Sequence, residues 1–113
     1  MAFSEWPFFE DIDFNTGNAL FGEDGVYTSL DDMERWIRAI DYNTLVDVST
    51  TQKIFSPVKT NSGETVQYGY GWRMEKYSDE IDLICHSGSW VGFNTLIAKE
   101  SKRNTWFVAY FEY

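Results

Sequence analysis

The stretch LICHSGSWVGFNTLIA, residues 83–98, places an apolar segment on each side of a short run of small polar residues. The two apolar segments predict neighbouring antiparallel strands. The polar run between them is either an ordinary hairpin turn or a strand backbone that is exposed beside a polar side chain. Side chains alternate between the two faces of a strand, so we expect His86 and Gly88 on one face and Ser87 and Ser89 on the other.

Two helices are predicted before this stretch. Ser29 followed by Asp32 has the outline of a capping box and starts a helix over about residues 29–41. Its apolar residues recur at helical spacing and form one face: Leu30, Met33, Trp36, Ile37 and Ile40. A second, shorter helix is expected from an N-cap at Ser49, with Pro57 just beyond its end.

The second half of the chain has the pattern of strands. TVQYGYGWRMEKY carries two glycines inside an aromatic strand, which suggests a bend or a close approach of the backbone. EIDLICH, WVGFNTLIAKE, the turn SKRN and TWFVAYFEY follow. Short turns between consecutive strands imply antiparallel pairing. The fold class is therefore α+β, with two helices followed by an antiparallel β-meander.

The chain of 113 residues fits one domain over residues 1–113. We divide it into an irregular acidic leader (1–24), a helical part (25–60) and antiparallel strands (64–113). Residues 1–34 hold nine acidic and no basic side chains, within a net charge of −9. That charge argues against nucleic acid and anionic membrane as partners, because both would be repelled.

Cysteine and histidine content limits the chemistry further. One cysteine cannot form an internal disulfide, and one histidine cannot complete a zinc site with it. We expect no metal and no cofactor, and we expect Cys85 to be a buried apolar residue. No apolar run is long enough to span a membrane, and the start lacks the features of a signal peptide, so the compartment stays open.

The run HSGS, residues 86–89, is the candidate site. Because Gly88 has no side chain, a ligand can lie against the strand with the imidazole of His86 beside it. The amide of Ser89 is then placed to donate to a ligand oxygen, as one half of an oxyanion hole. The structural alternative is a bulge or turn with an incidental imidazole.

Three motifs together resemble one family. GEDGVYTSLDDMERW, YGYGW and HSGSWVGFNTLIA are similar, in order and spacing, to the C-terminal portion of the serine β-lactamase-related family, across residues 22–99. That family includes class C β-lactamases, D-Ala-D-Ala carboxypeptidases and related esterases. The resemblance implies a partial β-lactamase-like α/β domain and an acyl-serine mechanism on amide, ester or peptidoglycan-like substrates.

The resemblance also implies roles for particular residues. His86, Ser87 and Gly88 match the family's third motif, K-T-G or H-x-G, and Ser89 matches the residue whose amide completes the oxyanion hole. Ser87 and Trp90 are expected to contact substrate. A histidine in place of lysine, which many family esterases and peptidases also have, would bind a substrate carboxylate less firmly.

The other two family motifs are not recognised in this chain. Ser56-Pro57-Val58-Lys59 spells S-x-x-K, but it follows the second helix, so we interpret it as a coincidence. Tyr27-Thr28-Ser29 only loosely echoes Y-x-N and lies at a helix start. We therefore expect a C-terminal part of a serine hydrolase that is inactive in isolation and is completed by the remainder of the parent protein.

A different class of function remains open beside this one. The chain would then be a non-catalytic binding or interaction module that keeps a β-lactamase-like sheet. In either case a small sheet with only two helices leaves one face poorly covered. We expect self-association through that uncovered face, because apolar surface left in water is unfavourable.

Overall fold

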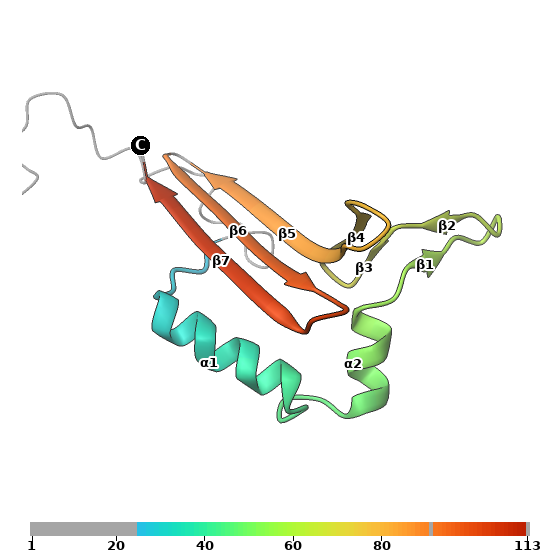
Figure 1. The fold of residues 1–113 in the computed structure, drawn as a ribbon, viewed down its shortest axis with the longest axis horizontal. Helices are drawn as coiled ribbons and strands as arrows, with labels where there is room; N and C mark the ends of the chain where they lie inside the picture. Colours follow the sequence, from blue (N-terminus) through green and yellow to red (C-terminus); the bar gives the residue numbers. More distant parts are fainter. Residues whose placement is uncertain (1–24, 91, 113) are drawn as a thin grey trace, which may run out of the picture.

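The computed structural model describes residues 25–90 and 92–112, so the predicted leader over residues 1–24 lies outside the described residues. Two helices, α1 (Leu30–Asp41) and α2 (Val48–Ile54), precede all the strands. The strands are β1 (Val58–Lys59), β2 (Thr65–Val66), β3 (Tyr68–Gly69), β4 (Trp72–Lys76), β5 (Asp82–Trp90), β6 (Phe93–Glu100) and β7 (Thr105–Glu112). The predicted α+β class, two helices followed by an antiparallel meander, is confirmed (Figure 1).

The sheet holds five antiparallel strands in the order β3-β4-β5-β6-β7, and β1 and β2 form a separate two-stranded ribbon. The ribbon projects from the side of the domain (Figure 1). Each strand of the larger sheet pairs with the next one in the sequence, as short turns require. β5 runs without a break through Trp90, so the run HSGS belongs to a strand and is not the hairpin turn.

Helix α1 starts where its capping residues predict. The Ser29 hydroxyl accepts a hydrogen bond from the Asp32 amide at 3.1 Å and donates one to the Asp32 carboxylate. The helix ends because Asn43, just after the C-cap Tyr42, adopts a left-handed φ of 55°. Asparagine tolerates that conformation better than most residues and commonly closes a helix in this way.

The prediction for the start of α2 was wrong by two residues. Its N-cap is Asp47, whose carboxylate accepts from the Thr50 amide at 2.7 Å and from the Ser49 hydroxyl at 2.8 Å. Asp and Ser are similarly good N-caps, and the earlier residue takes the position here, with Ser49 as its partner. Pro57 does lie just beyond the helix end, as expected.

The aromatic strand predicted over TVQYGYGWRMEKY is in fact three short strands. The break between β3 and β4 lies at the second of its two glycines. Tyr70 and Gly71 have φ values of 45° and 90° and form the two-residue turn between β3 and β4, where both residues must be left-handed. Gly69 packs so closely on the Ser56 carbonyl that a side chain there would collide with it. Gly71 therefore lies in the predicted bend, and Gly69 makes the predicted close approach of the backbone.

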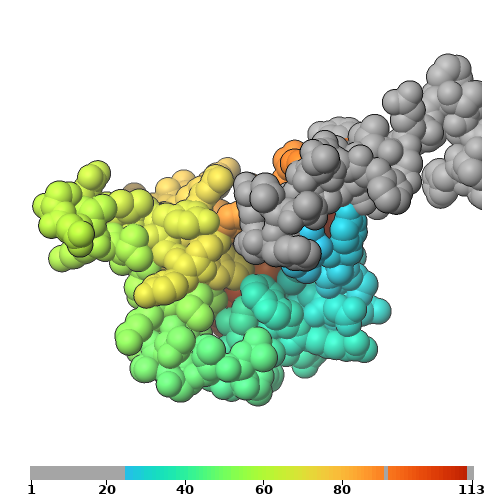
Figure 2. Space-filling model, turned by 180° about the vertical axis from the view of Figure 1, so that it is seen from behind, coloured from blue at the N-terminus to red at the C-terminus, as the bar shows by residue number. Residues whose placement is uncertain are grey.

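The core is a cluster of aromatic rings between the helices and the sheet. Trp72 of β4 is 6% exposed and stacks on Trp36 of α1 with a ring-centroid distance of 6.0 Å. Phe55, which follows α2, lies 5.5 Å from Trp72, and Trp106 of β7 lies 5.8 Å from it. These contacts attach both helices to one face of the sheet, which we call the helix face. Figure 2 shows the helices covering it.

A partly buried ion pair reinforces this attachment. Lys99 of β6 contacts Asp41, the last residue of α1, at 2.7 Å, and the two side chains are only 14% and 22% exposed. The second carboxylate oxygen of Asp41 accepts a hydrogen bond from the Trp106 indole at 2.9 Å. The Lys99 ammonium also lies over the rings of Phe55 and Trp106, at 5.5 and 4.9 Å from their centroids. The pair thus joins α1, the end of α2, β6 and β7.

The opposite face of the sheet, which we call the open face, is covered by neither helix. The apolar β5, β6 and β7 side chains on it are Leu83, Cys85, Leu96, Ala98, Phe107, Ala109 and Phe111, and the polar ones are Ser87, Ser89, Asn94, Glu100 and Thr105. Phe107 and Phe111 are each 56% exposed. Among the described residues, this arrangement agrees with the expectation that two helices leave one face poorly covered.

Candidate functional site

The candidate site lies where β5 extends past the end of β4. β4 pairs with β5 only as far as Arg73, which is opposite Cys85. β6 pairs with β5 as far as Trp90. Within the part of the chain that the structure describes, residues 86–90 therefore have a strand neighbour on one edge only.

The direction of the backbone groups at this edge follows from the hydrogen bonds at the other end of β5. The Ile81 carbonyl accepts from the Tyr77 amide on the β4 side, and the Asp82 carbonyl accepts from the Ser101 amide on the β6 side. Successive residues of a strand alternate between its two edges, and the register is unbroken through Trp90. The amides and carbonyls of Ser87 and Ser89 consequently point to the edge that β4 leaves open.

The side chains alternate as well. His86 and Gly88 lie on the helix face, and Ser87 and Ser89 lie on the open face. His86 is half-buried, and its ring meets Tyr68 of β3 edge-on at 6.3 Å. Ser87, Gly88 and Ser89 are all exposed.

Gly88 is exposed. Among the described residues, a Cβ atom at this position would have one heavy-atom neighbour within 4 Å outside the adjacent residues, the Thr95 hydroxyl at 2.8 Å. Thr95 is directly opposite Gly88 in the register. The glycine thus serves two purposes, since it leaves the strand surface bare and leaves room for the threonine.

Two polar atoms near this end of the sheet are buried and have no hydrogen-bond partner among the described residues. They are the indole nitrogen of Trp90 and the hydroxyl oxygen of Tyr110. Tyr110 is opposite Thr95, which is opposite Gly88, so the three residues form one row across the sheet. Burial raises the pKa of Tyr110, which keeps its hydroxyl a neutral donor. Sequence reasoning included Trp90 but missed Thr95 and Tyr110, because only the register places them beside Gly88.

Comparison with known proteins identifies the family of this chain. The sequence profile of the β-lactamase family matches residues 3–112. The chain belongs to the β-lactamase family. It is also similar to penicillin-binding protein 4* of Bacillus subtilis (strain 168), at 30% identity over 78 residues. That alignment covers 69% of this chain and 17% of the relative, so the chain spans less than a fifth of that protein. No solved structure matches the chain significantly.

Two short motifs that echo other parts of a β-lactamase-family site have structural roles in this chain. The Ser56 hydroxyl donates to the Gln52 carbonyl at the end of α2, and no contact joins it to Lys59 among the described residues. Ser29, the last residue of the Tyr27-Thr28-Ser29 echo, is the N-cap of α1. These contacts favour the interpretation that both matches are coincidental.

Cys85, adjacent to His86, lies on the opposite face of β5. It is buried at 9% exposure, across from Arg73 and Ala98. Burial, together with the charge of Glu75, raises the pKa of its thiol, and Arg73 offsets this only in part. A thiol that stays protonated at neutral pH is a poor nucleophile, so Cys85 acts as an apolar residue of the sheet.

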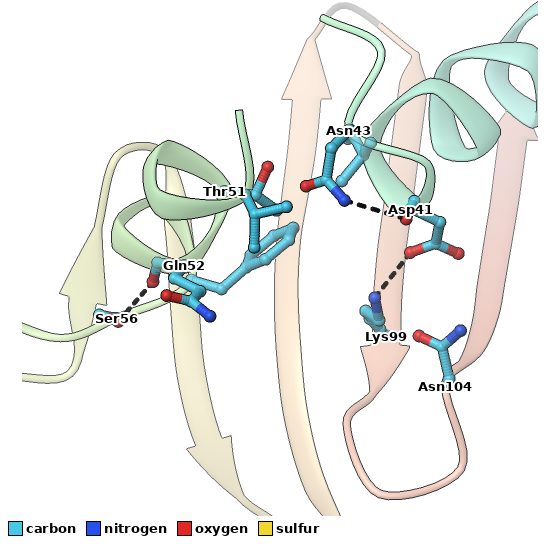
Figure 3. Close-up of a pocket in the computed structure, with 10 residues that line it drawn as sticks. Asp41, Asn43, Thr51, Gln52, Ser56, Lys99 and Asn104 are labelled. Carbon is cyan, nitrogen blue, oxygen red and sulfur yellow. Dashed lines mark hydrogen bonds and ion pairs between the residues drawn. The ribbon is translucent and has the colours of Figure 1, made fainter. Parts of the chain in front are cut away.

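A pocket of about 460 Å³ lies elsewhere in this β-lactamase-family chain, between the helices and the β6–β7 turn (Figure 3). Its lining residues are Ile40, Asp41, Asn43, Val48, Thr51, Gln52, Phe55, Ser56, Lys99 and Asn104. Figure 3 shows its two charged groups, Asp41 and Lys99, turned toward each other. Lys99 lies about 13 Å along β6 from Thr95, so none of the predicted site residues lines this pocket.

The described residues contain no group of three or more histidine, cysteine, aspartate or glutamate side chains able to hold a metal ion. Within the same residues, neither helix is long and apolar enough to cross a membrane.

Proposed function

We propose that the open edge of β5 receives the acyl group of an amide or ester substrate, as part of a β-lactamase-related serine hydrolase. The observation that supports this most strongly is the edge at residues 86–90, which no described strand pairs with. There the Ser89 amide points outward and no side chain of Gly88 obstructs the strand. An unpaired amide is a donor for an oxygen on which negative charge develops.

In this proposal each residue of the strand has its own part. The Ser89 amide donates to the carbonyl oxygen of the substrate, and the Ser87 main chain, two residues earlier on the same edge, pairs with the substrate backbone or ring. His86, held edge-on by Tyr68, lies beside the bound group. Ser87 and Trp90 make the remaining contacts with the substrate.

One backbone donor on a strand positions a carbonyl but does not attack it. Acyl transfer also needs a nucleophile and a base, and in the described part of the chain no serine hydroxyl contacts a lysine. We therefore propose that the chain alone does not turn over substrate and that other segments of a larger hydrolase supply the missing groups.

Benzylpenicillin is a suitable probe because the relative is named as a penicillin-binding protein. Titrated into the ¹⁵N-labelled chain, it should shift the Ser89 amide resonance more than those of β7. Ser89→Ala keeps the amide and should keep this response, whereas Ser89→Pro removes the N–H and should lose it. Proline is tolerated at an unpaired edge position, so the two variants should fold alike. Equal responses from both would contradict the assignment of the amide.

Hydrolysis assays with nitrocefin and p-nitrophenyl esters test the remaining part of the proposal. We expect no turnover by the isolated chain. Turnover that Ser56→Ala abolishes would show that Ser56 is a true nucleophile and that the proposal is wrong.

The second candidate function is a non-catalytic interaction module. The exposed Phe107 and Phe111 on the open face favour it, because monomeric proteins rarely expose neighbouring large apolar side chains. In that case benzylpenicillin should leave the Ser89 amide unmoved, and the interaction should involve β7.

A further inference from the structure

The pocket in Figure 3 has the size of a small-molecule site. Its volume of about 460 Å³ falls within the range of roughly 300–1,000 Å³ that such sites occupy. Its walls come from the end of α1, from α2, from the end of β6 and from the β6–β7 turn. All of these segments are described, so the pocket does not depend on any strand edge being unpaired.

The charge inside the pocket is balanced. Its two charged side chains, Asp41 and Lys99, contact each other at 2.7 Å, and no other charged side chain among the described residues lines it. The second oxygen of Asp41 already accepts a hydrogen bond from the Trp106 indole. An anion would have to compete with Asp41 for Lys99, and a cation would have to compete with Lys99 for Asp41. A ligand without net charge avoids both costs, because it leaves the ion pair intact.

Several polar groups at the pocket keep the capacity to bond a ligand. The side-chain amides of Gln52 and Asn104 make no hydrogen bond within the described part of the chain. The Lys99 ammonium has three N–H groups, and its one hydrogen bond there goes to Asp41. The Ser56 hydroxyl donates to the Gln52 carbonyl, which leaves its oxygen able to accept. Figure 3 shows Gln52 and Asn104 on opposite sides of Lys99, so a fitting ligand offers donors and acceptors in several directions.

We propose that this pocket binds a neutral sugar, with one hexose ring between α2 and the β6–β7 turn. A hydroxyl group both donates and accepts, as a side-chain amide does, so the sugar hydroxyls bond Gln52 and Asn104. A further hydroxyl oxygen accepts from Lys99, which keeps its bond to Asp41. The C–H groups of the ring then pack on the apolar residues of the lining. These are Ile40, Val48 and Phe55.

This site is separate from the edge of β5 that is proposed to receive the acyl group. Lys99 lies four residues along β6 from Thr95, the residue opposite Gly88, and Asn104 lies beyond the end of β6. Neither proposal therefore depends on the other. A single sugar ring in an open pocket should bind weakly, with a dissociation constant of about 1–10 mM.

Titration of the ¹⁵N-labelled chain with glucose, galactose and mannose tests the site by NMR. At least one of these sugars should shift the side-chain amide resonances of Gln52 and Asn104 until they saturate, and should leave the Ser89 amide unmoved. Glucuronate and glucosamine supply an anionic and a cationic form of the same ring. Both should bind more weakly than the neutral sugar, because each competes with one member of the ion pair.

Two variants test the contacts. Gln52→Leu and Asn104→Gly each remove one side-chain amide. Gln52 is exposed, and glycine readily adopts the left-handed φ of 51° found at Asn104, so both variants should fold. Each should weaken sugar binding about fivefold, the effect of one lost neutral hydrogen bond. Lys53→Leu is the matched control, because Lys53 is exposed on α2 and does not line the pocket. It should bind the sugar as the unmodified chain does.

Three results would overturn the proposal. They are the absence of a saturable shift with all three neutral sugars, tighter binding of glucuronate or glucosamine, and an affinity in Gln52→Leu and Asn104→Gly as high as in Lys53→Leu. Tighter binding of glucuronate would show that Lys99 holds an anion instead. The response of the Ser89 amide to benzylpenicillin is measured separately, so failure here leaves the proposed function to its own test.

Discussion

The ion pair between Asp41 and Lys99 gives the sharpest test of how the helices are held on the sheet. Asp41→Ala leaves Lys99, whose side chain is 14% exposed, without its carboxylate partner, and leaves the Trp106 indole without an acceptor. Breaking a buried pair costs about 3–5 kcal/mol, and partial exposure places this one at the lower end. An unsatisfied indole adds about 1 kcal/mol. We therefore expect Asp41→Ala to lower the free energy of unfolding by about 3–4 kcal/mol.

A double-mutant cycle separates the pair from its surroundings. Lys99→Met keeps the apolar stem between Phe55 and Trp106 and removes the charge, so it should cost about 2–3 kcal/mol. In Asp41→Ala/Lys99→Met neither charge remains unpaired. The two single losses should then fail to add, with a coupling of about 2 kcal/mol.

Urea unfolding followed by tryptophan fluorescence measures these differences, because Trp36, Trp72 and Trp106 all belong to the cluster. The exposed pair of Glu34 and Arg38 on α1 provides the control, since both side chains are more than 60% exposed. Glu34→Ala should cause no measurable change. An Asp41→Ala variant as stable as Glu34→Ala, or a coupling of zero, would refute the account of how α1 is attached.

Single contacts support three further predictions. Gly88→Ala should destabilise the chain by about 1–3 kcal/mol because its methyl group would meet the Thr95 hydroxyl, and Thr95→Ala in the same chain should recover most of that loss in thermal unfolding. Ser29→Ala should cost about 1 kcal/mol through the lost N-cap, while Ser29→Asn should stay near the original stability, as thermal unfolding followed by circular dichroism can show. The raised pKa of Cys85 means that the unfolded chain loses its thiol proton first, so stability should fall as the pH rises above the ordinary thiol value of 9.0. Cys85→Ala should lack that part of the fall in urea titrations at different pH values.

Local patterns predicted much of this fold. The helix at Leu30–Asp41 combines a cap, an acidic first turn and one apolar face, and all three signals agree with its observed bounds. The order of the later strands follows from short turns alone. In such segments local preference and tertiary packing favour the same structure, so sequence patterns suffice.

Other features depend on contacts between distant residues and have no local signal. Asp41 and Lys99 are 58 positions apart, and nothing near either residue indicates the other. The close approach of Gly69 to the Ser56 carbonyl joins two segments that no local pattern connects. The start of α2 depends on whether the preceding loop places Asp47 or Ser49 at the N-cap position, and it places Asp47 there.

The candidate site falls between these two cases. The motif HSGS identified His86, Gly88 and Ser89, and alternation along a strand gave their faces. The neighbours Thr95 and Tyr110 could not be predicted, because a shift of one residue in register would replace both. The open edge itself depends on where β4 ends, which only the structure shows.

Amide hydrogen exchange across β5 measures whether the strand edge at residues 86–90 is open. If the edge beyond Cys85 is open, the Ser87 and Ser89 amides should exchange at rates close to those of an unstructured peptide. The amides of His86 and Gly88, which bond to β6, should be strongly protected. Equal protection of all four amides would mean that another segment already covers this edge, and would contradict the assignment of a substrate-binding strand.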